Sequence, residues 1–258
     1  MKKLLFISMV AILGFASCNN NPKQTDNSAK ADSTEVAAPN ALTQAETTDG
    51  WILLFDGTAP GKWRGYNKDH FPAGWEVVDG ALHCKGSGRG EAGGEKDGGD
   101  IMFPEKFQNF ELSLEWKISE GGNSGIFYLA QESPEKTIWQ TAPEMQVLDN
   151  IKHPDGRDEI HCAGALYDLI PVAKDKVKPV GEWNQAKILV FKGLVEHWLN
   201  GQKVVEYHLW TPEWDAMVAK SKFPEYNKDW AKVAQEGFIG LQDHGDDVWY
   251  RNIKIKKM

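Results

Sequence analysis

Short runs of alternating apolar and polar residues fill the chain from Trp51 onward, and glycine, aspartate and asparagine residues separate them. Successive side chains of an extended strand point to opposite faces, so this alternation is typical of sheets that bury one face. Runs that follow one another closely, joined by turn residues, favour antiparallel sheets over alternating strands and helices. The sequence therefore predicts an all-β fold in which two antiparallel sheets pack together.

The pattern also places individual strands and turns. Asp79-Gly80 and Asn200-Gly201 are typical of tight hairpin turns. One helical insertion is expected between Thr211 and Gln235, because Thr211 can cap a helix and Pro212 suits its first turn. The expected strands are Trp75–Val78, Ala81–Cys84, Phe110–Ile118, Ser124–Ala130, Glu144–Leu148, Ala186–Phe191, Leu194–Leu199, Gln202–Glu206, Gly237–Gln242 and Val248–Lys256.

The first seventeen residues have the features of a signal peptide. Lys2 and Lys3 precede an apolar run, Leu4 to Phe15, that is too short to span a bilayer about 30 Å thick as a helix. Small residues stand directly before Cys18, as in the bacterial lipoprotein signal, so we expect Cys18 to be lipidated and to begin the mature chain. A plain secretory peptide with a leftover thiol is the alternative.

Residues 18–49 lack aromatic side chains and are rich in Asn, Ala, Thr, Ser, Asp and Lys. Such a segment cannot bury enough apolar area to offset the entropy of ordering, so a flexible tether is predicted there. Residues 50–258 are then the folded domain. These features together predict a lipoprotein of the bacterial cell envelope, periplasmic or on the cell surface, that reaches the membrane through its lipid anchor.

Net charge and cysteine content limit the partners and the compartment. The formal charge is −8, and removal of residues 1–17 takes away two lysines and no acid, which leaves −10. Nucleic-acid binding depends on clustered cations that neutralise phosphates, so we expect no nucleic-acid partner, and neutral ligands fit better. Cys84 and Cys162 could pair in an oxidising compartment, but their spacing does not decide this.

Polar residues interrupt three of the strand-like segments: Lys117–Tyr128 (KISEGGNSGIFY), Glu144–Asn150 (EMQVLDN) and Gly237–Asn252 (GFIGLQDHGDDVWYRN). A polar group that is buried without a partner costs about 1 to 3 kcal/mol. Acids, amides and histidines in such runs therefore indicate a concave polar face that binds a ligand, and not additional core.

Strand alternation groups the residues of these clusters by face. Glu144 and Gln146 share one face of their strand, and Met145 and Val147 point to the core side. Gln242 and His244 likewise share a face opposite Ile239 and Leu241. Further candidates for ligand contacts are Glu115, Asn123, Asp149, His153, Tyr167 and Arg251, of which Arg251 is expected on the strand adjacent to Gly237–Gln242.

A metal site is left undecided by the sequence. Asp149, His153 and His244 offer oxygen and nitrogen ligands that a divalent cation could use, but no closely spaced ligand pair supports such a site. The sequence contains no CxxC metal pattern and no phosphate-binding glycine fingerprint. No cofactor is therefore predicted with certainty, and a divalent cation stays open.

The three clusters, with LFDGTAPGKWRGY near residue 60, WEVVDGAL near 80 and EHWLNGQKVVEY near 200, resemble the 3-keto-disaccharide hydrolase domain family. The resemblance runs from about Trp51 to Lys257. It implies a concanavalin-like jelly-roll sandwich and hydrolysis of a glycoside already oxidised to a ketone at C3. It also implies a histidine before the isoleucine of the third cluster, where this chain has Phe238.

A ketone at C3 acidifies the proton on C2, so one base can remove it and the glycosidic oxygen can leave C1 by β-elimination before water adds back. We expect Glu144 or His244 to be that base and the other to assist the leaving group. Asn123, Gln146, Tyr167 and Gln242 would orient hydroxyl groups of the carbohydrate.

Two other functions remain open. One is a conventional glycosidase on unoxidised glycans, which would pair Glu144 with Glu115 or Asp149, although Gln146 stands where a second acid would be expected. The other is a surface module that binds carbohydrate without catalysis. The sugar, its linkage and anomer, and the oligomeric state are not predicted.

Overall fold

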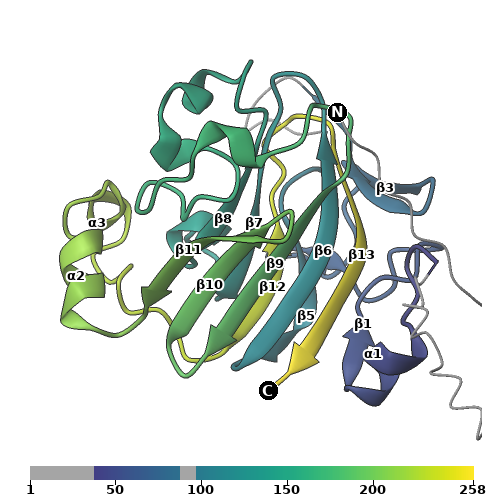
Figure 1. Cartoon of the computed structure of the whole chain (residues 1–258), viewed down its shortest axis with the longest axis horizontal. Helices are drawn as coiled ribbons and strands as arrows, with labels where there is room; N and C mark the ends of the chain where they lie inside the picture. The colour runs from purple at the N-terminus through teal and green to yellow at the C-terminus, as the bar shows by residue number, and fades with distance from the viewer. Residues whose placement is uncertain (1–37, 88–96) are drawn as a thin grey trace, which may run out of the picture. The chain divides into compact units, whose positions relative to one another are not determined.

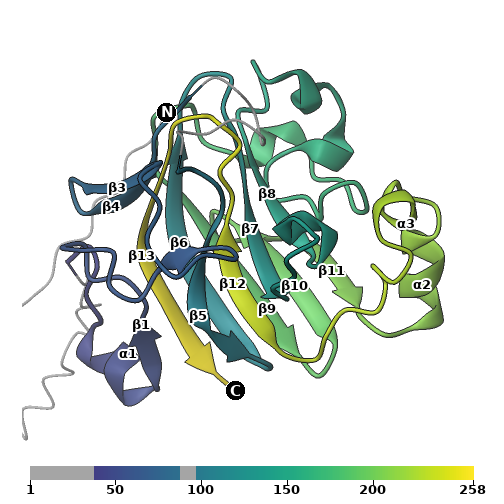
Figure 2. The same cartoon turned by 180° about the vertical axis from the view of Figure 1, so that it is seen from behind.

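The computed structural model describes residues 38–87 and 97–258. The predictions for the signal peptide, for Cys18 and for most of the tether lie outside these residues. Two antiparallel sheets make up the described part, and they face each other as two layers (Figures 1 and 2). The predicted class, an all-β sandwich of two antiparallel sheets, is confirmed.

The eight-stranded sheet contains the two ends of the domain side by side. β13 lies near its middle and pairs with β6, β4 and β1 (Figure 1). The order along the sheet is β11 (Gln202–His208), β10 (Leu194–Leu199), β9 (Asn184–Phe191), β6 (Phe110–Ile118), β13 (Val248–Lys257), β4 (Ala81–Cys84) and β3 (Trp75–Val78), with β1 (Trp51–Leu53) also on β13.

The five-stranded sheet is the nearer layer in Figure 2. Its order is β2 (Arg64–Gly65), β5 (Ile101–Phe107), β12 (Gly237–Leu241), β7 (Asn123–Ala130) and β8 (Glu144–Leu148). β7 and β8 are buried along their whole length.

The core between the sheets follows the predicted alternation. Leu112, Leu114 and Trp116 of β6 are at most 1% exposed, and Met145 and Val147 of β8 meet them from the other layer. Burial of large apolar side chains contributes roughly 1.5 to 3 kcal/mol each, so this layer fixes which face of every strand points outward. Glu144 and Gln146 are thereby turned away from the core.

Both predicted hairpin turns are present. Asp79 and Gly80 have φ angles of 50° and 72°, and Asn200 and Gly201 have 51° and 80°. Two successive positive φ angles define the turn type that matches the twist of the adjoining strands. These turns connect β3 to β4 and β10 to β11.

The helical insertion is two short helices, α2 (Pro212–Val218) and α3 (Phe223–Tyr226), beside the end of β11 (Figure 1). The predicted cap is present, because Thr211 Oγ1 accepts a hydrogen bond from the Trp214 amide. Short 3-10 turns occupy the longer loops: Ile138–Gln140, Pro154–Arg157, Glu159–His161 and Lys174–Lys176. No helix of the described residues is long and apolar enough to cross a membrane.

The N-terminal part of the domain differs from the prediction. Helix α1 (Gln44–Thr48) lies within the segment assigned to the flexible tether. Asn40 exchanges hydrogen bonds with Asn252 and donates to the Gly80 carbonyl, and Glu46 pairs with Lys254. Polar contacts rather than apolar burial hold this segment, so its composition gave no sign of order.

Cys84 and Cys162 are both buried free thiols, and no disulfide joins them.

Candidate active site

A cavity of about 190 Å³ opens on the outer face of the five-stranded sheet. Six of the residues predicted to contact ligand line it together: Asn123, Glu144, Gln146, Tyr167, Gln242 and His244. They come from β7, β8, the loop after β8 and the end of β12, which are neighbours in this sheet. The expectation that the polar clusters meet on one face is therefore met for these six.

Gly125 creates the space that Glu144 occupies. The two residues lie on adjacent strands, and a Cβ atom at Gly125 would stand 2.0 Å from Glu144 Oε1. Any larger side chain would displace the carboxylate, although the flexible end of Glu144 could move without unfolding the sheet. The glycine of the NSG sequence thus sets the position of the acid, which is only 7% exposed.

His244 follows β12 in a loop that also carries Asp246. His244 Nδ1 lies 3.8 Å from Asp246 Oδ2, and the same oxygen accepts a hydrogen bond from the Asn123 amide at 3.1 Å. Ser124 Oγ donates to the Gln242 carbonyl at 2.7 Å, which ties this loop to β7. Asp246 and Ser124 therefore fix the backbone at Asn123 and Gln242, and Asp246 lies beside the imidazole of His244.

Asn123 is placed to bind a ligand. Its side chain is 4% exposed, and its Oδ1 atom has no hydrogen-bond partner among the described residues. A buried acceptor without a partner costs about 1 to 3 kcal/mol, so a hydroxyl group that donates to it would recover much of that free energy.

Lys222 and Tyr167 form the opposite wall. Lys222 Nζ lies 3.1 Å from the Tyr167 hydroxyl and above its ring, and the Lys222 amide donates to Asp168. The Tyr167 amide in turn donates to the Glu144 carbonyl. An ammonium group and a phenol are thus brought close to the strand that carries the carboxylate.

Aromatic side chains of the helical insertion complete the rim. Phe223 stacks on Trp230 with ring centroids 3.9 Å apart, and Trp230 donates to the carbonyl of Trp139. Tyr226 meets Trp139 edge to face at 4.9 Å. Sequence patterns missed Trp139, Lys222, Phe223 and Tyr226, which line the cavity from loops and short helices without periodicity.

Glu115 and Arg251 do not reach this cavity. They lie on β6 and β13, on the outer face of the other sheet, where Arg251 Nε donates to Glu115 Oε2 at 2.7 Å and stacks on Trp183. The prediction that Arg251 lies on a strand adjacent to Gly237–Leu241 is wrong. The chain crosses from one sheet to the other after β12, so β13, which carries Arg251, pairs with β6 and β4 and not with β12.

Asp149 has a structural position in the turn after β8. Its two oxygens accept hydrogen bonds from the amides of Gly121, Ile151 and Lys152, and it does not line the cavity. His153 lies near the site, with its ring centroid 6.1 Å from that of His244. Partial burial lowers the pKa of His153, and His244 adds to this effect while Asp155 opposes it.

Asp149, His153 and His244 are the residues that the sequence offers as ligands of a divalent cation. Among the described residues, no three His, Cys, Asp or Glu side chains converge as a group that could hold a metal ion. Asp149 directs its oxygens to backbone amides, so the combination of Asp149, His153 and His244 does not fit a cation site.

Comparisons with known proteins agree with this fold. Residues 50–256 match the family described as the 3-keto-alpha-glucoside-1,2-lyase-like domain. A 3-keto-disaccharide hydrolase of Bacteroides thetaiotaomicron is 48% identical over 244 residues, which cover 87% of this chain and 84% of that protein.

Two solved structures from Parabacteroides distasonis, each described as a candidate glycosyl hydrolase, are also similar. One has a TM-score of 0.76 at 30% identity and covers 86% of this chain and 100% of its own. The other has a TM-score of 0.63 at 29% identity, with 81% and 99% covered.

Fold, cavity and relatives together define a β-sandwich of the glycosyl-hydrolase class. Within this class, the chain belongs to the family of 3-keto-α-glucoside-1,2-lyase-like domains, as the motif resemblance implied.

Proposed function

We propose that the protein cleaves 3-keto-glycosides by elimination of the glycosidic oxygen followed by addition of water. Its family and its 48% identity to a 3-keto-disaccharide hydrolase make it an enzyme that hydrolyses glycosidic bonds. The family description names a 1,2-lyase, which supports elimination across C1 and C2, with loss of the oxygen on C1 and of the proton on C2. One observation carries the mechanism: Glu144 is the one carboxylate among the described residues that line the cavity.

A single base is sufficient for this chemistry. Removal of the C2 proton leaves an enolate whose charge rests on the C3 oxygen, and expulsion of the C1 oxygen then forms a double bond between C1 and C2. Water adds to C1, and C2 takes a proton back, so the sum of the steps is hydrolysis. Direct displacement at an unoxidised sugar instead requires two carboxyl groups across the bond.

The geometry favours Glu144 as the base and His244 as the acid. Glu144 is nearly buried in the space above Gly125, on the wall of the cavity where the oxidised ring would bind. Asp246 lies next to His244, and a carboxylate beside an imidazole orients it and stabilises its protonated form. His244 would then protonate the departing oxygen.

Lys222 and Tyr167 are suited to stabilise the enolate. An ammonium group within hydrogen-bond distance of a phenol polarises its O–H, and donors aimed at a developing oxyanion contribute strongly inside a cavity. Asn123, Gln146 and Gln242 would bind the remaining hydroxyls of the oxidised ring.

The conventional glycosidase has little support from these positions. Glu115 lies on the outer face of the other sheet, and Asp149 is bound to backbone amides. Neither is placed to act with Glu144 across a bond in the cavity.

Incubation with methyl 3-keto-α-glucoside and with unoxidised methyl α-glucoside tests the proposal. Release of methanol from the oxidised substrate alone is the expected result. Release from the unoxidised substrate would overturn the elimination mechanism. Binding of the oxidised substrate without any product would favour the non-catalytic module, and Glu144→Gln would then bind it as tightly as the wild-type protein.

We also propose that the protein is a lipoprotein of the bacterial cell envelope. Its support is the sequence before the folded domain, where Cys18 follows an apolar run and small residues. Mass spectrometry of the mature protein should find an acylated Cys18 at the amino terminus, and an unmodified terminus would contradict the proposal.

A further inference from the structure

A second cavity of about 230 Å³ adjoins the first, and Trp139 and Gln242 line both. The two compartments have similar sizes and share one aromatic wall. The reaction on the oxidised ring uses only the first compartment. The second therefore has room for the part of the substrate that departs.

Two loops enclose the second cavity and are fixed to each other. The Tyr66 hydroxyl donates to the Gln131 carbonyl at 2.9 Å and accepts from the Ser133 amide at 3.1 Å. The Arg64 guanidinium makes two parallel hydrogen bonds to the Glu132 carboxylate, of 2.6 and 2.7 Å. Such paired bonds hold both position and angle, so these walls exist before any ligand binds.

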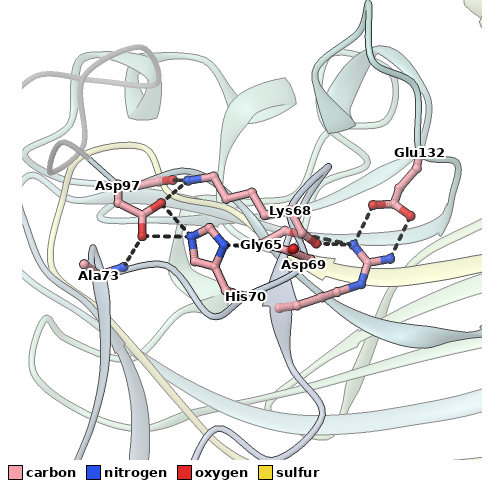
Figure 3. A network of polar contacts seen from close by, with 9 residues as sticks. Gly65, Lys68, Asp69, His70, Ala73, Asp97 and Glu132 are labelled. Carbon is pink, nitrogen blue, oxygen red and sulfur yellow. Dashed lines mark hydrogen bonds and ion pairs between the residues drawn. The ribbon is translucent and has the colours of Figure 1, made fainter.

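A third segment is fixed by the polar network in Figure 3. Asp97 accepts hydrogen bonds from Lys68 Nζ at 2.6 Å and from the Ala73 amide at 3.1 Å, and His70 Nε2 lies 3.0 Å away. Asp97 leads directly into Gly99 and Asp100, which line the second cavity. The network therefore holds the cavity wall that carries Asp100.

Both hydrogen-bond donors and acceptors face this space. Asp100 Oδ1 accepts from the Asp243 amide, and a carboxylate oxygen can accept a further bond from a sugar hydroxyl. Lys136 is half-buried on the opposite loop and supplies a donor. Trp139 presents an aromatic ring at the boundary with the first compartment. Polar groups around one aromatic ring are typical of sites that orient a small hydroxylated ring.

We propose that the second cavity binds the leaving sugar ring of a 3-keto-disaccharide, with Lys136 and Asp100 as its polar contacts and Trp139 as its apolar contact. This inference rests on the proposed function, since it assigns the oxidised ring to the first compartment. It makes the protein selective for disaccharides over glycosides with a small leaving group.

Kinetics with a 3-keto-disaccharide of glucose and with methyl 3-keto-α-glucoside test the subsite. The wild-type protein should show the higher kcat/KM for the disaccharide. Lys136→Ala should lower kcat/KM for the disaccharide about tenfold more than for the methyl glycoside, because one charge-assisted hydrogen bond is lost. Lys152→Ala, an exposed lysine on another loop, is the matched control and should change neither value.

The outcomes separate the two proposals. If Lys136→Ala lowers kcat/KM equally for both substrates, or if the wild-type protein has the same kcat/KM for both, the subsite proposal is overturned. Turnover of both oxidised substrates would still support the proposed function. Binding of D-glucose, measured by nuclear magnetic resonance, gives a second reading without turnover. We expect Lys136→Ala to weaken that binding about tenfold. Absence of glucose binding to the wild-type protein would contradict the subsite whatever the kinetics show.

Discussion

His197 should make the stability of this protein depend on pH in a defined window. The side chain is fully buried in the core, where Nδ1 bonds the Gly164 carbonyl at 3.0 Å and Nε2 bonds the Tyr128 hydroxyl at 2.7 Å. The ring is therefore neutral, with its proton on Nδ1. Burial lowers the pKa of His197 from 6.5 to about 4, and the bond to Gly164 opposes this only in part.

The sign and size of the effect follow from linkage. Below pH 6.5 the unfolded chain binds a proton at this histidine and the folded chain does not, so stability falls as pH decreases towards 4. The pKa of His197 differs by about 2.5 between the unfolded and the folded protein, which corresponds to about 3 kcal/mol of unfolding free energy over the whole window. About 2 kcal/mol of this is lost between pH 7 and pH 4.5.

Urea unfolding of the wild-type protein and of His197→Gln at both pH values measures this contribution. The variant loses stability at pH 7, but its free energy of unfolding should fall by about 2 kcal/mol less than that of the wild-type protein on acidification. Other titrating groups are common to both proteins and cancel in the comparison. Equal losses in the two proteins would refute the reasoning.

Three further substitutions address the site. Gly125→Ala should displace the Glu144 carboxylate and lower kcat about 100-fold or more, with a melting temperature close to that of the wild-type protein. Asp246→Asn should lower kcat about tenfold with little change in KM, because the imidazole of His244 loses its neighbouring charge. Arg251→Ala should leave kcat/KM unchanged and reduce stability by about 1 kcal/mol or less, as measured by urea unfolding, since its ion pair is partly exposed on the other sheet.

Alternation predicted the strands well because one face of each strand is buried. Trp75–Val78, Phe110–Ile118 and Glu144–Leu148 begin and end where the pattern indicated. β5 was missed. Its sequence contains Pro104, which cannot donate in a ladder, and the structure accommodates it where the register with β12 is irregular.

The candidate site could be predicted in part for the same reason. The face of Glu144 follows from that of its neighbours in β8. Gln242 and His244 lie just beyond the end of β12, so their presence in the cavity also depends on the loop that follows this strand. The order of strands is a long-range property that alternation does not contain, so Arg251 was placed beside the wrong strand. Lys222 and Trp139 could not be found, because their positions depend on contacts between loops such as the bond from Trp230 to Trp139.

Transfer of the C2 hydrogen tests the central claim most directly. With the wild-type protein, methyl 3-keto-α-glucoside with deuterium at C2 should react more slowly than the protium form and should lose its label to solvent water during turnover. With Glu144→Gln, the label should stay on C2 and no isotope effect should be seen. Products that keep the label at C2, formed without an isotope effect, would show that the glycosidic bond breaks without proton abstraction and would contradict the account.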